Sequence, residues 1–505
     1  MRNNVFFTNG LHLGRSLARS LALFVAVIAL AGCGLSPDYV RPELDLPDAY
    51  STASFESTLP ESKAVPSPVA TYTAETREWW RNFDSSALTA LQQRALANSF
   101  TFSAEREVLA QALYRARQAR SGLLPGINAT GSGSHRGSAV PGGYVKSDAL
   151  SGTLQASYEL DIWGANWETH QAAEHRFIAG LNAWRGMGLS LESEVALTYF
   201  AYLAARENLG VYDEILVNAR EVLAYQQTRE KLGAAAPLDV ARQGSSVSSM
   251  EAGRINYLIR MTEARNSLCQ LIGVAVFPED IALMMEKEKI ADMAPPVIVA
   301  GIPSDLLLRR PDLAQAESNL KAANADIGVA RAAFLPGITL SASAGWQSET
   351  LSSLVNPASA LFSLGASLLQ PIFQGGRIAN QYEQTLAAHR ELMDRYRQAA
   401  LSAFLDVATA LDSNKFLQEQ EAHRAFSREQ AAEAYRIARL RYEAGAEDFL
   451  AVLSAQESLL NTENQAIQSR LERLNTSIAL FKALGGGWSA ENPDFLEKKN
   501  GDSSR

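Results

Sequence analysis

The sequence predicts an α+β membrane protein. We expect a trimeric twelve-stranded outer-membrane β-barrel, with four strands from each chain, continuous with a long periplasmic α-helical coiled-coil tunnel. Three observations predict this class. The 505-residue chain contains an internal two-fold duplication, and each copy holds a pair of segments with strand-like alternation. Each copy also contains a helical pattern far longer than an average helix of three or four turns.

The duplication appears as repeated words at a fixed spacing. LLPGI and FLPGI place Pro125 and Pro336 211 residues apart, and the glycines Gly233 and Gly445 lie 212 residues apart. A solenoid repeats every 20 to 50 residues or so, so this longer period indicates one tandem duplication. It divides the chain into a signal peptide (1–32), a lipidated tether with an equatorial segment (33–100), repeat 1 (101–273), an equatorial linker (274–310), repeat 2 (311–485) and a C-terminal equatorial tail (486–505).

The N-terminus predicts export and lipidation. Eleven apolar residues, Leu21–Ala31, follow several arginines, and this run is shorter than the roughly 20 residues of a membrane-spanning helix. Cys33 comes directly after Leu-Ala-Gly, which resembles the lipobox of bacterial lipoproteins. That resemblance implies a covalent lipid on Cys33; the alternative is a cysteine that merely follows a cleaved signal. We expect no other cofactor, and we expect Cys269 to be a buried helix cysteine.

Composition and motifs argue against other classes. The formal net charge of −9 is unsuited to nucleic-acid binding, which requires a basic face. His170 and His175 lie five residues apart, whereas two ligands on one helical face need a spacing of about three or four. The glycines of 131–137 lack the spacing of a dinucleotide loop. We therefore expect no enzyme, no catalytic residue and no metal site.

Each repeat begins with a helix and continues with two strands. The helices are expected at 101–124 and 312–335, and each ends at a proline, Pro125 or Pro336, where the chain enters the barrel. Apolar and polar residues then alternate over 154–162 and 338–346, as in strands with lipid on one side and a lumen on the other. We expect loops at 134–148 and 347–360. The apolar residues expected to face lipid or a neighbouring chain in the second strand pair are Trp346, Leu361, Leu364, Leu368 and Ile372.

Very long helices follow the strands. The ranges 166–231 and 377–442 each contain 66 residues, which corresponds to a helix of about 100 Å. The chain then turns at Gly233 or Gly445 and returns through helices of 35 residues, expected at 237–271 and 450–484. Leucines at seven-residue spacing predict coiled-coil pairing in the first copy.

Four strands per chain cannot close a barrel, and open strand edges are not tolerated in lipid. Three chains give an even set of twelve strands, so we expect a homotrimer. Two alternatives remain open: an ordinary helical bundle, and a periplasmic coiled-coil lipoprotein that acts as an adaptor or scaffold. The scaffold requires one helical hairpin and no barrel.

Several longer motifs resemble those of the TolC/OprM family of outer-membrane efflux ducts, in particular its OprM/NodT-like lipoprotein branch. They are WWRNFDSSALTALQQRALANSF (79–100), SYELDIWG (157–164), GIPSDLLLRRPDLAQAE (301–317), ANADIGVARAAFLPGITLSASAG (323–345) and LFKALGGGW (480–488), together with the box at Cys33. The resemblance implies a passive exit duct for a tripartite system in the outer membrane. It implies as partners a periplasmic adaptor (membrane fusion) protein and an inner-membrane pump, usually of the RND class.

The same resemblance implies a gate at the tips of the helical hairpins, which turn at Gly233 and Gly445. Leu450 is expected to be the constricting residue. The family's aspartate ring one turn later corresponds here to Ser454, so that ring is not expected in the same form. Asp448 is expected to supply acidic charge at the mouth instead.

Overall fold

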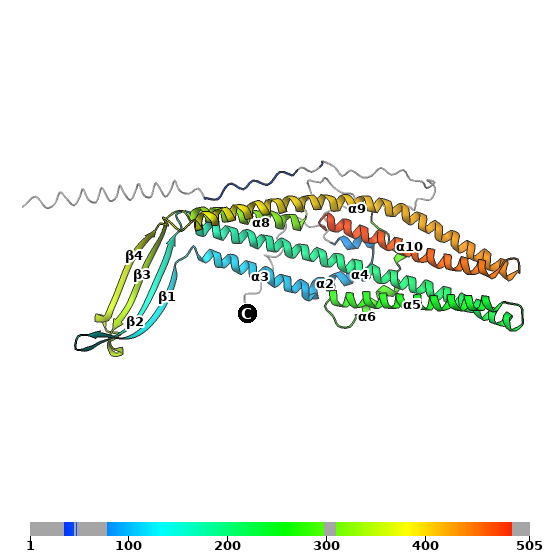
Figure 1. Cartoon of the computed structure of the whole chain (residues 1–505), viewed down its shortest axis with the longest axis horizontal. Helices are drawn as coiled ribbons and strands as arrows, with labels where there is room; N and C mark the ends of the chain where they lie inside the picture. The colour runs from blue at the N-terminus through cyan, green and yellow to red at the C-terminus, as the bar shows by residue number, and fades with distance from the viewer. Residues whose placement is uncertain (1–34, 45–46, 48–77, 297–309, 487–505) are drawn as a thin grey trace, which may run out of the picture. The chain divides into compact units, whose positions relative to one another are not determined.

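The structure is a computed structural model that describes residues 35–44, 47, 78–296 and 310–486 (Figure 1). The predicted signal peptide, Cys33 and nearly all of the C-terminal tail lie outside the described residues. The chain divides into two compact units, each built from both repeats. The strand unit contains the residues up to Glu43, Val108–Leu181 and Gln315–Arg397, and the helical unit contains Leu44–Glu107, Asn182–Ala314 and the chain from Gln398. None of the described helices combines the length and apolarity needed to span a bilayer.

The helices confirm the duplication. Helices α3 (Phe100–Ser121) and α8 (Pro311–Ala332) each have 22 residues. Both end four residues before a proline, and strands begin directly after Pro125 and Pro336. Proline cannot continue a helix and holds the preceding residue in an extended conformation, so each proline lies at a helix-to-strand junction as predicted.

The long helices also match in pairs. Helices α4 (Ala165–Lys231) and α9 (Arg377–Glu443) have 67 residues each, and α5 (Pro237–Leu271) and α10 (Phe449–Ala483) have 35 each. The predicted bounds agree with these to within one residue. Each hairpin turns at a glycine with a left-handed backbone, with φ of 72° at Gly233 and 73° at Gly445. That conformation costs an ordinary L-residue roughly 1–2 kcal/mol, which explains glycine at both turns.

The strand unit contains one antiparallel sheet in the order β1-β2-β3-β4 (Figure 1). Its strands are β1 (Gly126–Val140), β2 (Gly143–Leu160), β3 (Gly337–Ser348) and β4 (Ala360–Leu369). The expectation of a loop at 134–148 is wrong, because β1 and β2 stay paired up to Val140 and Gly143. Only Pro141 and Gly142 form the turn, and the small serines and glycines on either side pair as well as other residues do. The segment between β3 and β4 contains two short 3-10 helices.

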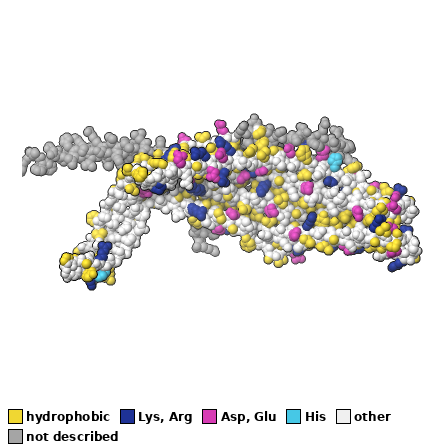
Figure 2. Space-filling model, viewed as in Figure 1, with side chains coloured by type: hydrophobic (Ala, Val, Ile, Leu, Met, Phe, Trp, Pro, Cys, Tyr) yellow, Lys and Arg dark blue, Asp and Glu magenta, His cyan; other side chains and the backbone are white. Residues whose placement is uncertain are grey.

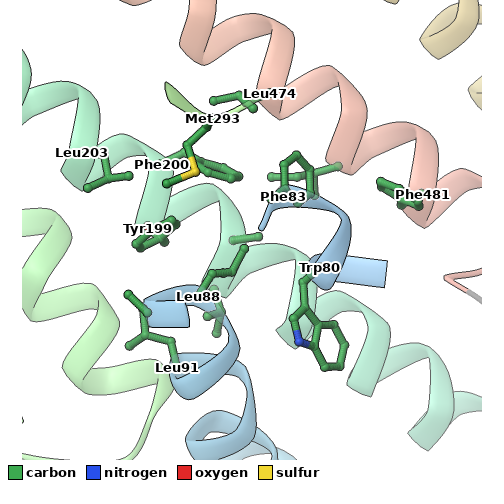
Figure 3. Close-up of a cluster of buried hydrophobic side chains, with 14 of the residues drawn as sticks. Trp80, Phe83, Leu88, Leu91, Tyr199, Phe200, Leu203, Met293, Leu474 and Phe481 are labelled. Carbon is green, nitrogen blue, oxygen red and sulfur yellow. The ribbon is translucent and has the colours of Figure 1, made fainter. Parts of the chain in front are cut away.

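The core of the helical unit is rich in aromatic rings (Figure 3). Residues of η2 (Trp79–Phe83) and α2 (Ser86–Asn98) pack against α4 and α10, and the ring centroids of Trp79 and Phe481 lie 5.3 Å apart. Residues of α6 (Glu279–Lys287) join the same cluster. These contacts hold segments from both predicted equatorial regions in one core, although the domain boundaries themselves stay a prediction.

Glu288 fastens the segment after α6 to the start of α2. Its carboxylate accepts hydrogen bonds from the hydroxyl of Ser85 (2.8 Å) and the backbone nitrogens of Ser86 (3.0 Å) and Ala87 (3.3 Å). Arg206 of α4 donates to the backbone carbonyls of Met285 and Glu288. A negative charge at a helix N-terminus satisfies free N–H groups, so this contact stabilises the core.

Candidate functional site: the faces of the sheet and the hairpin tips

One face of the sheet is polar. Residues opposite each other in an antiparallel ladder point to the same face, and the face alternates along each strand. The register therefore forms one row across all four strands from Asn128, Gln155, Ser343 and Ser363. Hydroxyl pairs of 2.8 Å link neighbouring strands on this face: Thr130–Thr153, Ser132–Ser151 and Ser343–Ser363.

The other face is apolar. One row across the sheet consists of Ile127, Ala156, Ala342 and Leu364. Several of its side chains are largely exposed in the single chain, including Phe362 (82%), Leu364 (81%) and Leu368 (66%). An apolar outward row opposite a polar inward row is the pattern of a membrane barrel strand. The predicted alternation is therefore confirmed.

Two details differ from the sequence prediction for the second strand pair. Leu361 pairs with Gly345 and lies on the polar face, whereas Trp346, Leu364 and Leu368 lie on the apolar face as expected. Ile372 follows the end of β4 and is 89% exposed. The leucine was misassigned because the alternation of β4 is interrupted by apolar residues at both of its ends.

Charged residues are sparse on the sheet. Across the part where all four strands pair, Glu159 is the charged residue of the described polar face. Basic and histidine side chains gather at the end of the strands, where Arg136, Lys146 and the paired His135 and Asp148 lie (Figure 2). A lumen wall built from this face therefore consists mostly of hydroxyl, amide and glycine surface.

The tip of the second hairpin contains the residues predicted for the gate. Asp448 is the N-cap of α10, and its carboxylate accepts a 3.0 Å hydrogen bond from the backbone nitrogen of Ala451. Leu450 lies in the first turn with 49% of its surface exposed, and Ser454 lies exposed one turn later. Glu447 forms an ion pair of 3.4 Å with Arg441. Leu450 is thus free to contact another molecule or chain, and the carboxylate of Asp448 also serves as a helix cap.

Tyr442 ties the two hairpins together. Its hydroxyl accepts hydrogen bonds from Nε2 of Gln226 (2.6 Å) and from a guanidinium nitrogen of Arg229 (3.1 Å), both on α4. The same guanidinium lies 5.8 Å from the ring centroid of Tyr442 and 5.7 Å from that of Tyr225. Below this link, Phe449, Val452 and Leu453 of α10 form a small buried cluster with Val222 of α4.

The link at Tyr442 was not predicted from the sequence. A signal was present, because the first repeat has Glu230 at the position 212 residues earlier, where the surrounding residues otherwise match. A groove of about 610 Å³ runs between α5 and α10 near the tips, and Leu450, Arg242, Ser249 and Glu457 are among its lining residues. Within the described part of the chain, no group of three or more His, Cys, Asp or Glu side chains is placed to hold a metal ion.

The barrel-entry residues of the two repeats are joined within the chain. The indole nitrogen of Trp163 donates a 2.8 Å hydrogen bond to the carbonyl of Pro336. Asp161 accepts hydrogen bonds from the backbone nitrogens of Asn166 and Trp167 and so caps the start of α4. Both contacts fix the foot of the sheet at the helix-to-strand junctions.

Long paired helices, hairpin tips and a two-faced sheet with open edges define the class of an outer-membrane channel with a helical periplasmic part. The sequence profile of the outer membrane efflux protein family matches residues 91–274 and again 302–486, once in each repeat. The chain belongs to this family.

Named relatives agree with this assignment. The chain is 36% identical over 494 residues to the pyoverdine export outer membrane protein OpmQ of Pseudomonas aeruginosa, covering 95% of this chain and 99% of that protein. It is 32% identical over 481 residues to the toluene efflux pump outer membrane protein TtgF of Pseudomonas putida, covering 94% and 98%. Both matches extend over nearly the full length of each protein.

Solved structures with the same fold include two outer-membrane channels. The Campylobacter jejuni CmeC channel has a TM-score of 0.80 at 25% identity, covering 93% of this chain and 97% of that one. The open state of the Neisseria gonorrhoeae MtrE channel has a TM-score of 0.78 at 27% identity, covering 90% and 98%. The predicted fold class, a trimeric twelve-stranded outer-membrane barrel with a periplasmic helical tunnel, is confirmed. The protein is an outer-membrane channel of an efflux system.

Proposed function

We propose that this protein is the passive exit duct of a tripartite efflux system and catalyses no reaction. In this proposal a homotrimer receives its cargo from a periplasmic adaptor and an inner-membrane pump, usually of the RND class. The observation that carries the proposal is the two-faced sheet, with its polar row at Asn128 and its apolar row at Ile127. Open strand edges are costly in lipid, so β1 and β4 favour closure with further copies and argue against a barrel-free scaffold.

The hairpin tips form the gate in this proposal. The hydrogen bonds from Gln226 and Arg229 to Tyr442 hold the two hairpins of one chain together. Leu450, half exposed at the tip, packs against its counterparts in the other two copies and narrows the entrance. Asp448 adds negative charge beside it and favours cations. An adaptor opens the entrance by separating the hairpins.

The lipid belongs to the same proposal. Cys33 carries a covalent lipid that anchors the N-terminus in the outer membrane, and the trimer contacts outer-membrane lipid through the apolar face of the sheet. A single acyl chain binds a membrane only marginally, so the barrel provides most of the anchoring and the lipid aids sorting. No other cofactor is proposed.

Deletion of the gene tests this function. Because relatives are named for pyoverdine, toluene and antibiotics, the strain is compared with its parent for retention or toxicity of these three kinds of compound. We expect accumulation of at least one, restored by the wild-type gene and equal to the effect of deleting the cognate RND pump. If pump deletion causes accumulation and deletion of this gene does not, the proposed role is wrong.

A further inference from the structure

Residues Leu35–Arg41, here called the strap, lie along α8 within the strand unit. A guanidinium nitrogen of Arg331 donates a 2.9 Å hydrogen bond to the carbonyl of Leu35. Asn324, two turns earlier on α8, donates a 2.6 Å hydrogen bond to the carbonyl of Pro37. The strap therefore runs antiparallel to the helix, with its N-terminal end beside the last turn of α8.

An ionic contact holds the other end of the strap. The guanidinium of Arg41 donates hydrogen bonds of 2.9 and 2.8 Å to Glu317, whose side chain is 12% exposed. Lys321, one turn further on, lies 3.0 Å from the same carboxylate and 5.2 Å from the ring centroid of Tyr39. Charge-assisted hydrogen bonds of this kind are about twice as strong as neutral ones.

Between these ends the strap meets the backbone of α8 at Gly328. A Cβ atom at this position would lie 2.9 Å from the backbone nitrogen of Ser36 and 3.0 Å from Cγ of Glu168. The hydroxyl of Ser36 also donates a 2.7 Å hydrogen bond to Glu168 of α4. A larger residue at 328 would therefore push the strap off the helix, so the close approach requires glycine.

The duplicated helix provides an internal comparison. Helix α3 matches α8 at a spacing of 211 residues at both of its ends. At the positions that correspond to Glu317, Asn324 and Gly328, α3 has Arg106, Leu113 and Arg117. One chain has only one N-terminus, and only α8 has the residues that bind the strap. These residues are thus an addition to the plan that the two helices share.

We propose that α8 contains a docking site for the strap and that this site fixes the lipid-bearing N-terminus beside the foot of the barrel. The proposal rests on the lipid proposed at Cys33. Leu35 is the second residue after Cys33, a chain length of about 7 Å, and Arg331 lies six residues before Gly337, where β3 begins. An acyl chain starting at this place enters the bilayer next to the strands of its own chain.

Crosslinking tests the docking in full-length protein in outer membranes, with Cys269 replaced by serine. The pair Pro37→Cys and Asn324→Cys should be joined by a short bis-thiol reagent within one chain. The control pair, Pro37→Cys and Leu113→Cys, uses the α3 counterpart and should not react. Equal crosslinking of the two pairs would overturn the docking site.

Proteolysis tests the role of Gly328. We expect chymotrypsin to cleave after Tyr39 at least about tenfold faster in Gly328→Leu than in wild type, because cleavage follows the population of the undocked strap. Arg117→Leu, the matched change on α3, should leave the rate unchanged. Wild type cleaved as rapidly as Gly328→Leu would contradict the docking, and the crosslinking decides the question independently if Gly328→Leu does not fold.

A photoactivatable fatty acid fed to the cells tests the position of the lipid. Label on Cys33 should crosslink to peptides of residues 337–348 in wild type, and this product should be lost in Gly328→Leu. If Cys33 carries no fatty acid, the proposed lipidation is wrong, whereas the Pro37–Asn324 crosslink still reports the docking by itself. Labelled Cys33 that crosslinks equally in both proteins would show that the strap does not position the lipid.

Discussion

The amide of Gln226 on α4 donates a 2.6 Å hydrogen bond to the hydroxyl of Tyr442 on α9, across 216 residues of sequence. Gln226 is only 1% exposed, and its Oε1 atom has no hydrogen-bond partner. Its Nε2 group therefore depends on Tyr442. This contact, with that of Arg229, is the polar link between the two hairpins near their tips.

Removal of the Tyr442 hydroxyl should loosen the tips. Tyr442→Phe leaves a buried amide donor without a partner, at a cost of about 1–3 kcal/mol. We expect faster uptake of a large antibiotic by cells that produce this variant, because the entrance opens more often. Tyr435→Phe is the matched control, since the buried hydroxyl of Tyr435 has no hydrogen-bond partner. Equal uptake in the two variants would show that the link does not close the entrance.

Leu450→Ser should widen the entrance. It replaces an apolar side chain that is 49% exposed at the tip with a smaller polar one, so the conductance of the open state should rise in planar bilayers. Leu238, 212 residues earlier in the first repeat, is 57% exposed at the other tip and provides the control variant Leu238→Ser. If both variants conduct like wild type, the constriction lies at another residue.

The two faces of the sheet should respond differently to charge. Leu368→Arg places a cation on the apolar face, at a cost of about 2–4 kcal/mol if the residue lies at the bilayer midplane. Leu361→Arg, on the polar face of the same strand, should be tolerated. The amount of heat-resistant trimer in outer-membrane fractions measures this difference. Similar yields would mean that the apolar face does not contact lipid.

The strap should detach in acid. Burial raises the pKa of Glu317, but hydrogen bonds from Lys321 and Arg41 outweigh this effect and leave the pKa below its ordinary value of 4.5. A carboxylate with a lowered pKa in the docked state stabilises docking fully above about pH 4.5 and loses this stabilisation as the pH falls further. The other groups that face it, Arg41, Lys321, Tyr39 and Tyr396, keep their protonation in this range.

Hydrogen exchange of the strap measures this effect. After correction for the intrinsic rate, exchange of strap amides should be slow at pH 6 and should accelerate below pH 4.5 or so. Glu317→Gln should exchange rapidly at both pH values, because it lacks the charge. Protection that does not change with pH in wild type would contradict a docking contact that depends on Glu317.

The helices and the strand faces could be predicted because local chemistry determines them. Proline at 125 and 336 and glycine at 233 and 445 mark the ends of elements, and each mark occurs twice at the same spacing. The alternation over 338–346 indicates which side chains share a face. The ribbon at 134–148 was missed because serine and glycine are common in loops, whereas backbone pairing alone decides whether they form a strand.

The tertiary links could not be predicted in the same way. The contact of Gln226 with Tyr442 and that of Arg41 with Glu317 join residues more than 200 positions apart. Helical periodicity predicts which face of a helix is buried, but it does not identify the residue on the partner helix. Comparison of the two repeats identifies such positions, because Tyr442 and Gly328 differ from their counterparts Glu230 and Arg117.

The most direct test of the central claim is the single-channel conductance of the purified trimer in planar bilayers, measured for wild type and Tyr442→Phe. A duct closed at its tips predicts small, discrete steps for wild type. It predicts larger or more frequent openings for Tyr442→Phe, with Tyr435→Phe unchanged. A folded, heat-resistant trimer that gives no steps in any of the three proteins would contradict the account of this chain as an export duct gated at its tips.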